Sequence, residues 1–260
     1  MHRIAKLDQA TSPTCQWVGV CISPVTPDQR HLGIIYREVE HGKLSHIHLA
    51  WHHMLTSEDE LPSGLLGDPS IHPARLRQVA AMCRKIWRQN GRAVPYAFSD
   101  PEGIFNPETG KILLGDTRYG LTCSSFVLAV FFACGLRIVN VSEWPNLREG
   151  DNEWQEFILG QLSRRLSGDE LRNVESQKGF ARFRPEEVIA AAVQFPHPRS
   201  CEQVRELSLE IIDAVNGRSR TPAAQEQTTP GKAGQSFRLV GWVVLLVIVS
   251  FLMLGWCVKH

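Results

Sequence analysis

The stretch HLGIIYREVEHGKLSHIHLAWHHM (31–54) decides the fold, because it reads as two β-strands joined by a tight turn. Residues 31–40 and 44–54 are rich in β-branched and aromatic side chains, which is typical of strands. His41-Gly42 between them is a hairpin-turn sequence. The stretch therefore predicts an antiparallel hairpin near the start of the chain.

More strands are expected around this hairpin, and helices are expected after it. WVGVCIS (17–23) is a further strand candidate, and RIVNVSEW (137–144) is another. Residues 73–90 place apolar side chains at helical spacing between Pro73 and Gly91. Further helices are expected at 151–166, 169–177, 184–194 and 201–217. Because strands come first and helices follow, the predicted fold class is α+β, an antiparallel sheet packed on helices.

Composition excludes some classes of function. The chain has 260 residues, 43% of them hydrophobic, which is enough for one sizeable domain. A net charge of +1 with scattered basic residues gives no sign of a nucleic-acid partner. The N-terminus lacks the apolar segment of a secretory signal, and the seven cysteines form no CxxC pair. We therefore expect free, reduced thiols and neither a disulfide framework nor a zinc ribbon.

The C-terminal segment LVGWVVLLVIVSFLMLGWCV (239–258) carries no charge and has a tryptophan near each end. About 20 apolar residues span a bilayer core as a helix, whereas buried core helices are seldom apolar on every face. We therefore expect a transmembrane helix at 238–258, after a flexible linker at 217–237 that is rich in Gly, Pro and Thr. The catalytic or binding domain would then comprise residues 1–216.

Basic residues flank this segment unequally. Arg218, Arg220, Lys232 and Arg238 precede it, whereas Lys259 follows it. The positive-inside rule then places the main domain on the cytoplasmic side of a single-pass C-terminal anchor.

A cysteine stands at the start of an apolar helical run in GLTCSSFVLAVFFACG (120–135). At a helix N-terminus, Cys123 would feel the positive end of the helix dipole, which favours the reactive thiolate. The free backbone N–H groups there can also bind a developing oxyanion. The alternative is a buried structural thiol, which is the interpretation that we give to Cys134 in the same helix.

Histidines gather in the predicted hairpin. His46 and His48 lie two apart on one strand and therefore share a face, and His31 can lie across from either of them. A cysteine nucleophile needs an imidazole base and a group that orients the base. The other histidines are expected to be solvent-facing or structural: His41, His52, His53, His72 and His197.

Three short motifs resemble those of NlpC-type papain-like cysteine hydrolases. They are HLGIIY (31–36), IHLA (47–50) and TCSSFV (122–127), with VPYAF (94–98) and RFRPEEV (182–188) as weaker matches. Thr122 stands where the family usually has Asp, and Ser125 where it has Gly. The histidine strands precede the cysteine, which is similar to the circularly permuted branch that includes lecithin:retinol acyltransferase-like proteins and bacterial permuted amidases.

The resemblance implies a permuted papain-like domain and a covalent mechanism. It implies Cys123 as nucleophile, His31 as base, and His48, or its rival His46, as the orienting residue. Tyr96 would lie near the nucleophile and assist the oxyanion. Attack on an amide, ester or thioester would give an acyl-enzyme, with no metal or cofactor. Peptides, acylated proteins or lipid-like molecules are the implied substrates.

Two other interpretations stay open. One is a metal site built from His46, His48 and either His52 or His53, since two histidines in an HxH pair are a real ligand spacing. The other is a membrane-tethered papain-like domain that binds without catalysing. An exported toxin that inserts into a target membrane is also compatible with the sequence.

Overall fold

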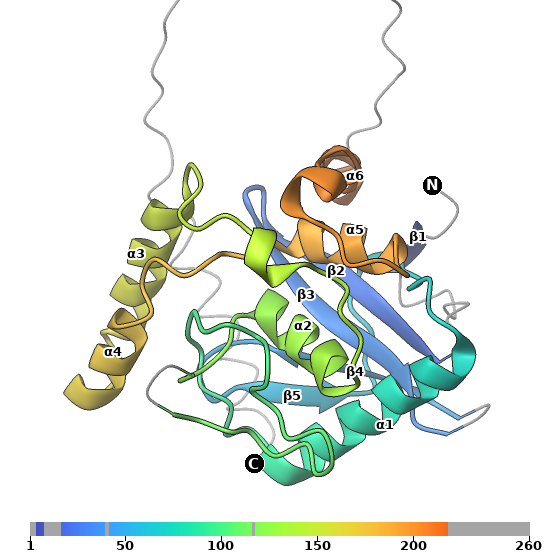
Figure 1. Ribbon diagram of the computed structural model, residues 1–260, viewed down its shortest axis with the longest axis horizontal. Coiled ribbons are helices and arrows are strands. Elements are labelled where there is room, and N and C mark those ends of the chain that lie inside the picture. Colours follow the sequence, from blue (N-terminus) through green and yellow to red (C-terminus); the bar gives the residue numbers. More distant parts are fainter. Residues whose placement is uncertain (1–3, 8–16, 40–41, 116–117, 218–260) are drawn as a thin grey trace, which may run out of the picture. The chain divides into compact units, whose positions relative to one another are not determined.

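A computed structural model describes residues 4–7, 17–39, 42–115 and 118–217 (Figure 1). By its internal contacts the chain divides into two units, residues 1–220 and 221–260. The second unit lies wholly outside the described residues, and so do the predicted transmembrane helix (238–258) and all but the first residue of the predicted linker (217–237). Among the residues that are described, no helix combines the length and apolarity needed to cross a bilayer.

The first unit is built on a six-stranded sheet in which every neighbouring pair is antiparallel. The strand order is β1-β6-β2-β3-β4-β5. The strands are β1 (Ile4–Leu7), β2 (Val18–Thr26), β3 (Gln29–Arg37), β4 (Leu44–Leu49), β5 (Leu55–Glu58) and β6 (Gly64–Gly67). The predicted hairpin is confirmed as β3 and β4, although a turn ends β4 before residue 54.

The helices follow the strands, as predicted. They are α1 (Pro73–Asn90), α2 (Cys123–Ala133), α3 (Asp151–Leu162), α4 (Gly168–Glu175), α5 (Pro185–Val193) and α6 (Cys201–Val215). The α+β class is therefore confirmed.

One strand prediction was wrong. Residues 137–144 contain a 3₁₀ turn, η1 (Val141–Glu143), and only Val139 forms a β-bridge, to Arg199. Trp144 explains the apolar pattern without a strand, because its ring is buried in the core and its indole N–H donates to the carbonyl of Arg182.

The two faces of the sheet carry different neighbours. Leu32, Ile34 and Tyr36 alternate along β3 and join the main core, which also takes in apolar residues of α1, α2 and α5. Ile35, between them, belongs to a smaller cluster with Cys21 on the other face. The register pairs Ile35 with His46, so the face opposite α2 is the face that bears histidines.

Helix α2 is apolar on all sides because it is buried on all sides. Its residues from Cys123 to Phe131 are all buried, and it contacts β3, β4, α1 and α5. A helix held this way presents its first residue, Cys123, in a fixed position.

Candidate active site

A capping box fixes the start of α2. The N–H of Ser125 donates to Oγ1 of Thr122 at 3.1 Å, and the N–H of Thr122 donates to Oγ of Ser125 at 2.8 Å. Thr122 and Ser125 are also the two residues that differ from the motif of the family that the sequence resembles. Together they cap the helix, with Cys123 as its first residue.

The thiol of Cys123 is buried, with 8% of the residue exposed. Burial raises its pKa, whereas the backbone N–H of Leu32, contacts with Ser124 and the positive charge of Arg182 lower it. Burial is the largest of these effects, so the pKa lies above its usual range and the resting group is the neutral thiol.

Two of the predicted histidines form a hydrogen-bonded pair. Nε2 of His31 lies 2.7 Å from Nδ1 of His48, and their rings meet edge to face with centroids 4.7 Å apart. Nε2 of His48 lies in turn 3.2 Å from Oε1 of Glu58 on β5. A chain of contacts thus runs from His31 through His48 to a carboxylate.

His46 takes a different position. Its ring stacks on His48 with centroids 4.3 Å apart and planes 9° from parallel. Its Nε2 is buried and has no hydrogen-bond partner among the described residues. The geometry therefore favours His48 over His46 as the residue that orients His31.

All three imidazoles are neutral at pH 7. Burial lowers the pKa of His31 to about 4 and that of His46 to about 2. The pKa of His48 is also lowered by burial, although its hydrogen bond to Glu58 opposes the effect. The resting site thus pairs neutral imidazoles with a neutral thiol.

The thiol and the imidazole pair lie toward different faces of β3, because Leu32 joins the core that contains Cys123, whereas His31 falls on the face that bears His46 and His48. The β3–β4 ladder extends only to the pair Ile34–Ile47, and the amide of Leu32, next to His31, contacts the sulfur of Cys123. Within the described residues, however, no hydrogen bond joins Sγ of Cys123 to His31.

Tyr96 lies close enough to Cys123 for a thiolate there to raise the pKa of its phenol, although burial is the larger cause. A β-bridge between Tyr96 and Leu121 holds the two segments together. The structure thus brings Tyr96 into the neighbourhood of Cys123.

Arg182 is a further charged group at this site, and sequence reasoning did not single it out. Its guanidinium stacks on Trp154, 4.1 Å from the ring centroid, and pairs with Asp151 at 3.4 Å. It lowers the pKa of Cys123 and so favours the thiolate. The only available signal was its place in the RFRPEEV segment.

Among the described residues, two groups of side chains could hold a metal ion: His46 with His48 and Glu58, and His52 with His53 and Glu170. The sequence-based metal hypothesis combined His46 and His48 with His52 or His53. In the structure His46 and His48 belong to one group and His52 and His53 to the other, and each group includes a glutamate.

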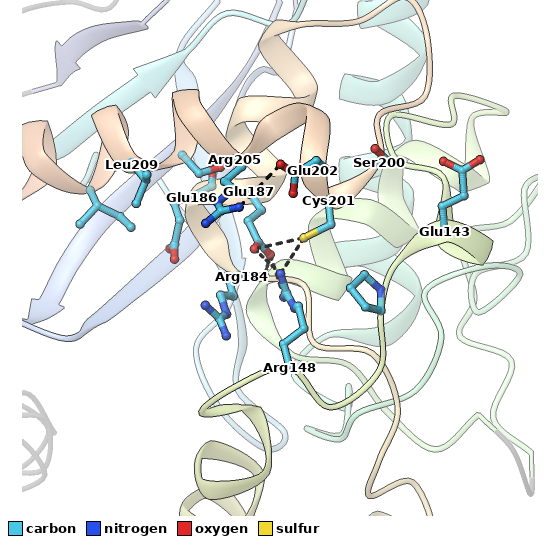
Figure 2. Close-up of a pocket in the computed structure, with 13 residues that line it drawn as sticks. Glu143, Arg148, Arg184, Glu186, Glu187, Ser200, Cys201, Glu202, Arg205 and Leu209 are labelled. Carbon is cyan, nitrogen blue, oxygen red and sulfur yellow. Dashed lines mark hydrogen bonds and ion pairs between the residues drawn. The ribbon is translucent and has the colours of Figure 1, made fainter.

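A cavity of about 560 Å³ opens elsewhere, between α5, α6 and residues 143–148 (Figure 2). Figure 2 shows Arg148 directed at Glu187 and at the sulfur of Cys201, 2.5 Å and 2.7 Å away. Neither Cys123 nor any histidine lines it.

Each of the three arginines that line this cavity pairs with a carboxylate. Arg148 pairs with Glu187, Arg205 with Glu202, and Arg184 with Asp151 just outside it. Such pairing is typical of a structural ion network. None of these arginines therefore offers an unpaired charge to a ligand in the cavity.

Comparison with family models, with curated proteins and with solved structures gives no match to this chain. The assignment of a function therefore depends on the geometry of the site and on the motif resemblance.

Proposed function

We propose that this protein is a thiol hydrolase or acyltransferase in which Cys123 is the nucleophile, His31 the base and His48 the residue that orients the base. Two observations support this proposal: the 2.7 Å hydrogen bond between His31 and His48, and the capped helix that begins at Cys123. A permuted papain-like arrangement of the domain is part of the same proposal.

The tautomers follow from the hydrogen bonds. If Nε2–H of His31 donates to Nδ1 of His48, then Nδ1 of His31 is free to accept a proton. Nε2–H of His48 then donates to Glu58, whose carboxylate holds the pair in this arrangement. Glu58 therefore completes the chain that orients the base.

The pKa directions favour proton transfer during attack over a resting ion pair. The pKa of the thiol is raised and that of His31 is lowered, so both groups begin neutral. His31 takes the thiol proton as sulfur attacks a carbonyl carbon, and later returns it to the leaving group. The backbone N–H of Cys123, with Tyr96, would stabilise the oxyanion.

Esters, thioesters and amides of membrane-proximal molecules are the proposed substrates. This choice rests on the apolar segment 239–258, which we propose as a membrane anchor that places the main domain on the cytoplasmic side. The test is membrane fractionation. The full chain is expected in an alkaline-resistant membrane pellet, whereas a chain ending at residue 217 is expected in the supernatant; a full chain that alkali extracts would contradict the anchor.

Trapping an acyl-enzyme tests the proposed chemistry. An activated aryl acetate is added to the full chain, and the acetyl adduct is located by peptide mass spectrometry. We expect the acetyl group on Cys123, a burst of phenolate release, and neither in Cys123→Ala. Acetylation spread over other cysteines and lysines, unchanged in that variant, would overturn the proposal and favour a non-catalytic binding domain.

A further inference from the structure

Three ligand-type side chains meet on the sheet face opposite α2. The register pairs His46 with Glu58 across β4 and β5, and His48 follows two residues along the same face. One nitrogen or oxygen from each of the three lies within 4.8 Å of the others. Each of the three residues lies on a strand, His46 and His48 on β4 and Glu58 on β5.

We propose that His46, His48 and Glu58 form a binding site for a divalent transition-metal ion, with Zn²⁺ as the best fit. Imidazole and carboxylate are ordinary zinc ligands, and three protein ligands leave a fourth position for water.

The spacing suits a tetrahedral site. Bonds of about 2.0–2.1 Å place tetrahedral ligand atoms roughly 3.3 Å apart. Nε2 of His48 lies 3.2 Å from Oε1 of Glu58, and Nδ1 of His46 lies 4.0 Å from the same oxygen. A small movement of the half-exposed Glu58 side chain closes the wider gap.

One further observation points to a ligand. His48 has its second ring nitrogen bound to His31, which is the outer-shell contact that metal-bound histidines usually make. The side chain of His46 is only 5% exposed, and its Nδ1, which lies 4.0 Å from Glu58, is the nitrogen that would bind the ion.

The second cluster is a poorer candidate for a chemical reason. The N–H of Tyr96 donates to Nδ1 of His52 at 3.1 Å, so neutral His52 must carry its proton on Nε2. Neither nitrogen is then free to ligate. His48 has no such restriction, because His31 can accept a proton from its Nδ1.

The metal site would also regulate the thiol, a consequence that rests on the proposed function. A metal on Nε2 of His48 places the ring proton on Nδ1, which then donates to Nε2 of His31. His31 then carries its own proton on Nδ1, the nitrogen that would act as base. Zn²⁺ is therefore expected to inhibit Cys123.

Cobalt titration tests the site directly. The full chain is cleared of metal with a chelator, titrated with Co²⁺ while its visible absorption is recorded, and back-titrated with Zn²⁺. We expect one tetrahedral Co²⁺ per chain, displaced by Zn²⁺, and affinity at least about tenfold weaker in Glu58→Gln. The matched control is Glu170→Gln in the second cluster, which is expected to bind as the parent does.

Absence of binding in the parent would overturn the site, as would equal affinity in Glu58→Gln or a loss confined to Glu170→Gln. The regulatory consequence has its own measurement, the alkylation of Cys123 with and without Zn²⁺. Slowing in the parent but not in Glu58→Gln supports it, and equal rates refute it. An unreactive Cys123 in chelator would count against the proposed function alone, because the cobalt titration does not depend on it.

Discussion

At the scale of single residues, the site depends on groups that shift the pKa of Cys123 in opposite directions. Burial raises this pKa, and the amide of Leu32, contacts with Ser124 and the guanidinium of Arg182 lower it. Among these groups, Arg182 is the one that carries a full positive charge. Its stacking on Trp154 holds the guanidinium in place.

Replacing Arg182 with Gln is therefore expected to raise the apparent pKa of Cys123, by up to about one unit, because the thiolate loses a nearby cation. The measurement is the pH dependence of Cys123 alkylation. Arg182→Lys keeps the charge and is the matched control, for which a smaller rise is expected. An unchanged or lower pKa in Arg182→Gln would show that its charge does not reach the thiol.

The sequence indicated candidate residues but not their contacts. His31, His48 and Cys123 stood out because their motifs resemble a family in permuted order. Glu58 did not stand out, because its contact with His48 depends on the β4–β5 register, which no local pattern reveals. Arg182 is brought to Cys123 only by tertiary packing.

At the scale of elements, helix α1 was predicted at its observed bounds because caps and apolar spacing agree there. The short strands β1, β5 and β6 have four residues each, too few for a period to be recognised. The length of the connection between β3 and β4 matters more for the proposed function than these short strands do. It sets the distance between His31 on β3 and His48 on β4.

Gly33 is the residue that lets the two strands bring their histidines together. A methyl group on it would overlap Nε2 of His46 and lie 3.0 Å from Cβ of His48. Gly33→Ala is expected to destabilise the fold by about 1–3 kcal/mol and to slow Cys123 alkylation, because the histidine rings must move.

Urea unfolding and the alkylation rate measure the two effects of Gly33→Ala. The matched control is Gly160→Ala, since Gly160 is exposed in α3 and a methyl group there meets no atom within 4 Å. That control is expected to stabilise the chain by about 0.5–1 kcal/mol through higher helix propensity. Equal stability of Gly33→Ala and the parent would contradict the packing described.

At the scale of the whole molecule, the order of strands first and helices afterwards was enough to predict the α+β class. The strand order was not predictable, because β6 inserts between β1 and β2 through contacts that are distant in sequence. The histidine face of the sheet is therefore a property of the assembled fold.

Stability is expected to depend on pH through these buried histidines. Their pKa values in the folded chain, about 4 for His31 and about 2 for His46, lie below the value of 6.5 for a free imidazole. The unfolded chain binds these protons first, so the stability present above pH 6.5 is lost progressively as pH falls toward those values.

Urea midpoints measured at falling pH check this dependence. Each unit of pKa difference corresponds to about 1.4 kcal/mol. His31→Gln lacks one of the groups, so the difference in stability between parent and variant should shrink as the pH is lowered. Parallel curves for the two proteins would contradict a depressed pKa of His31.

The most direct test of the central claim is the alkylation rate of each cysteine in the full chain, read by mass spectrometry after limiting iodoacetamide. Parent, His31→Ala and His48→Ala are compared across pH, with the buried Cys83 and the partly exposed Cys201 as internal references. We predict that Cys123 reacts faster than Cys83 near neutral pH, that His31→Ala slows it about tenfold or more, and that His48→Ala slows it less. A Cys123 that reacts no faster than Cys83, or that is indifferent to both histidines, would contradict the account.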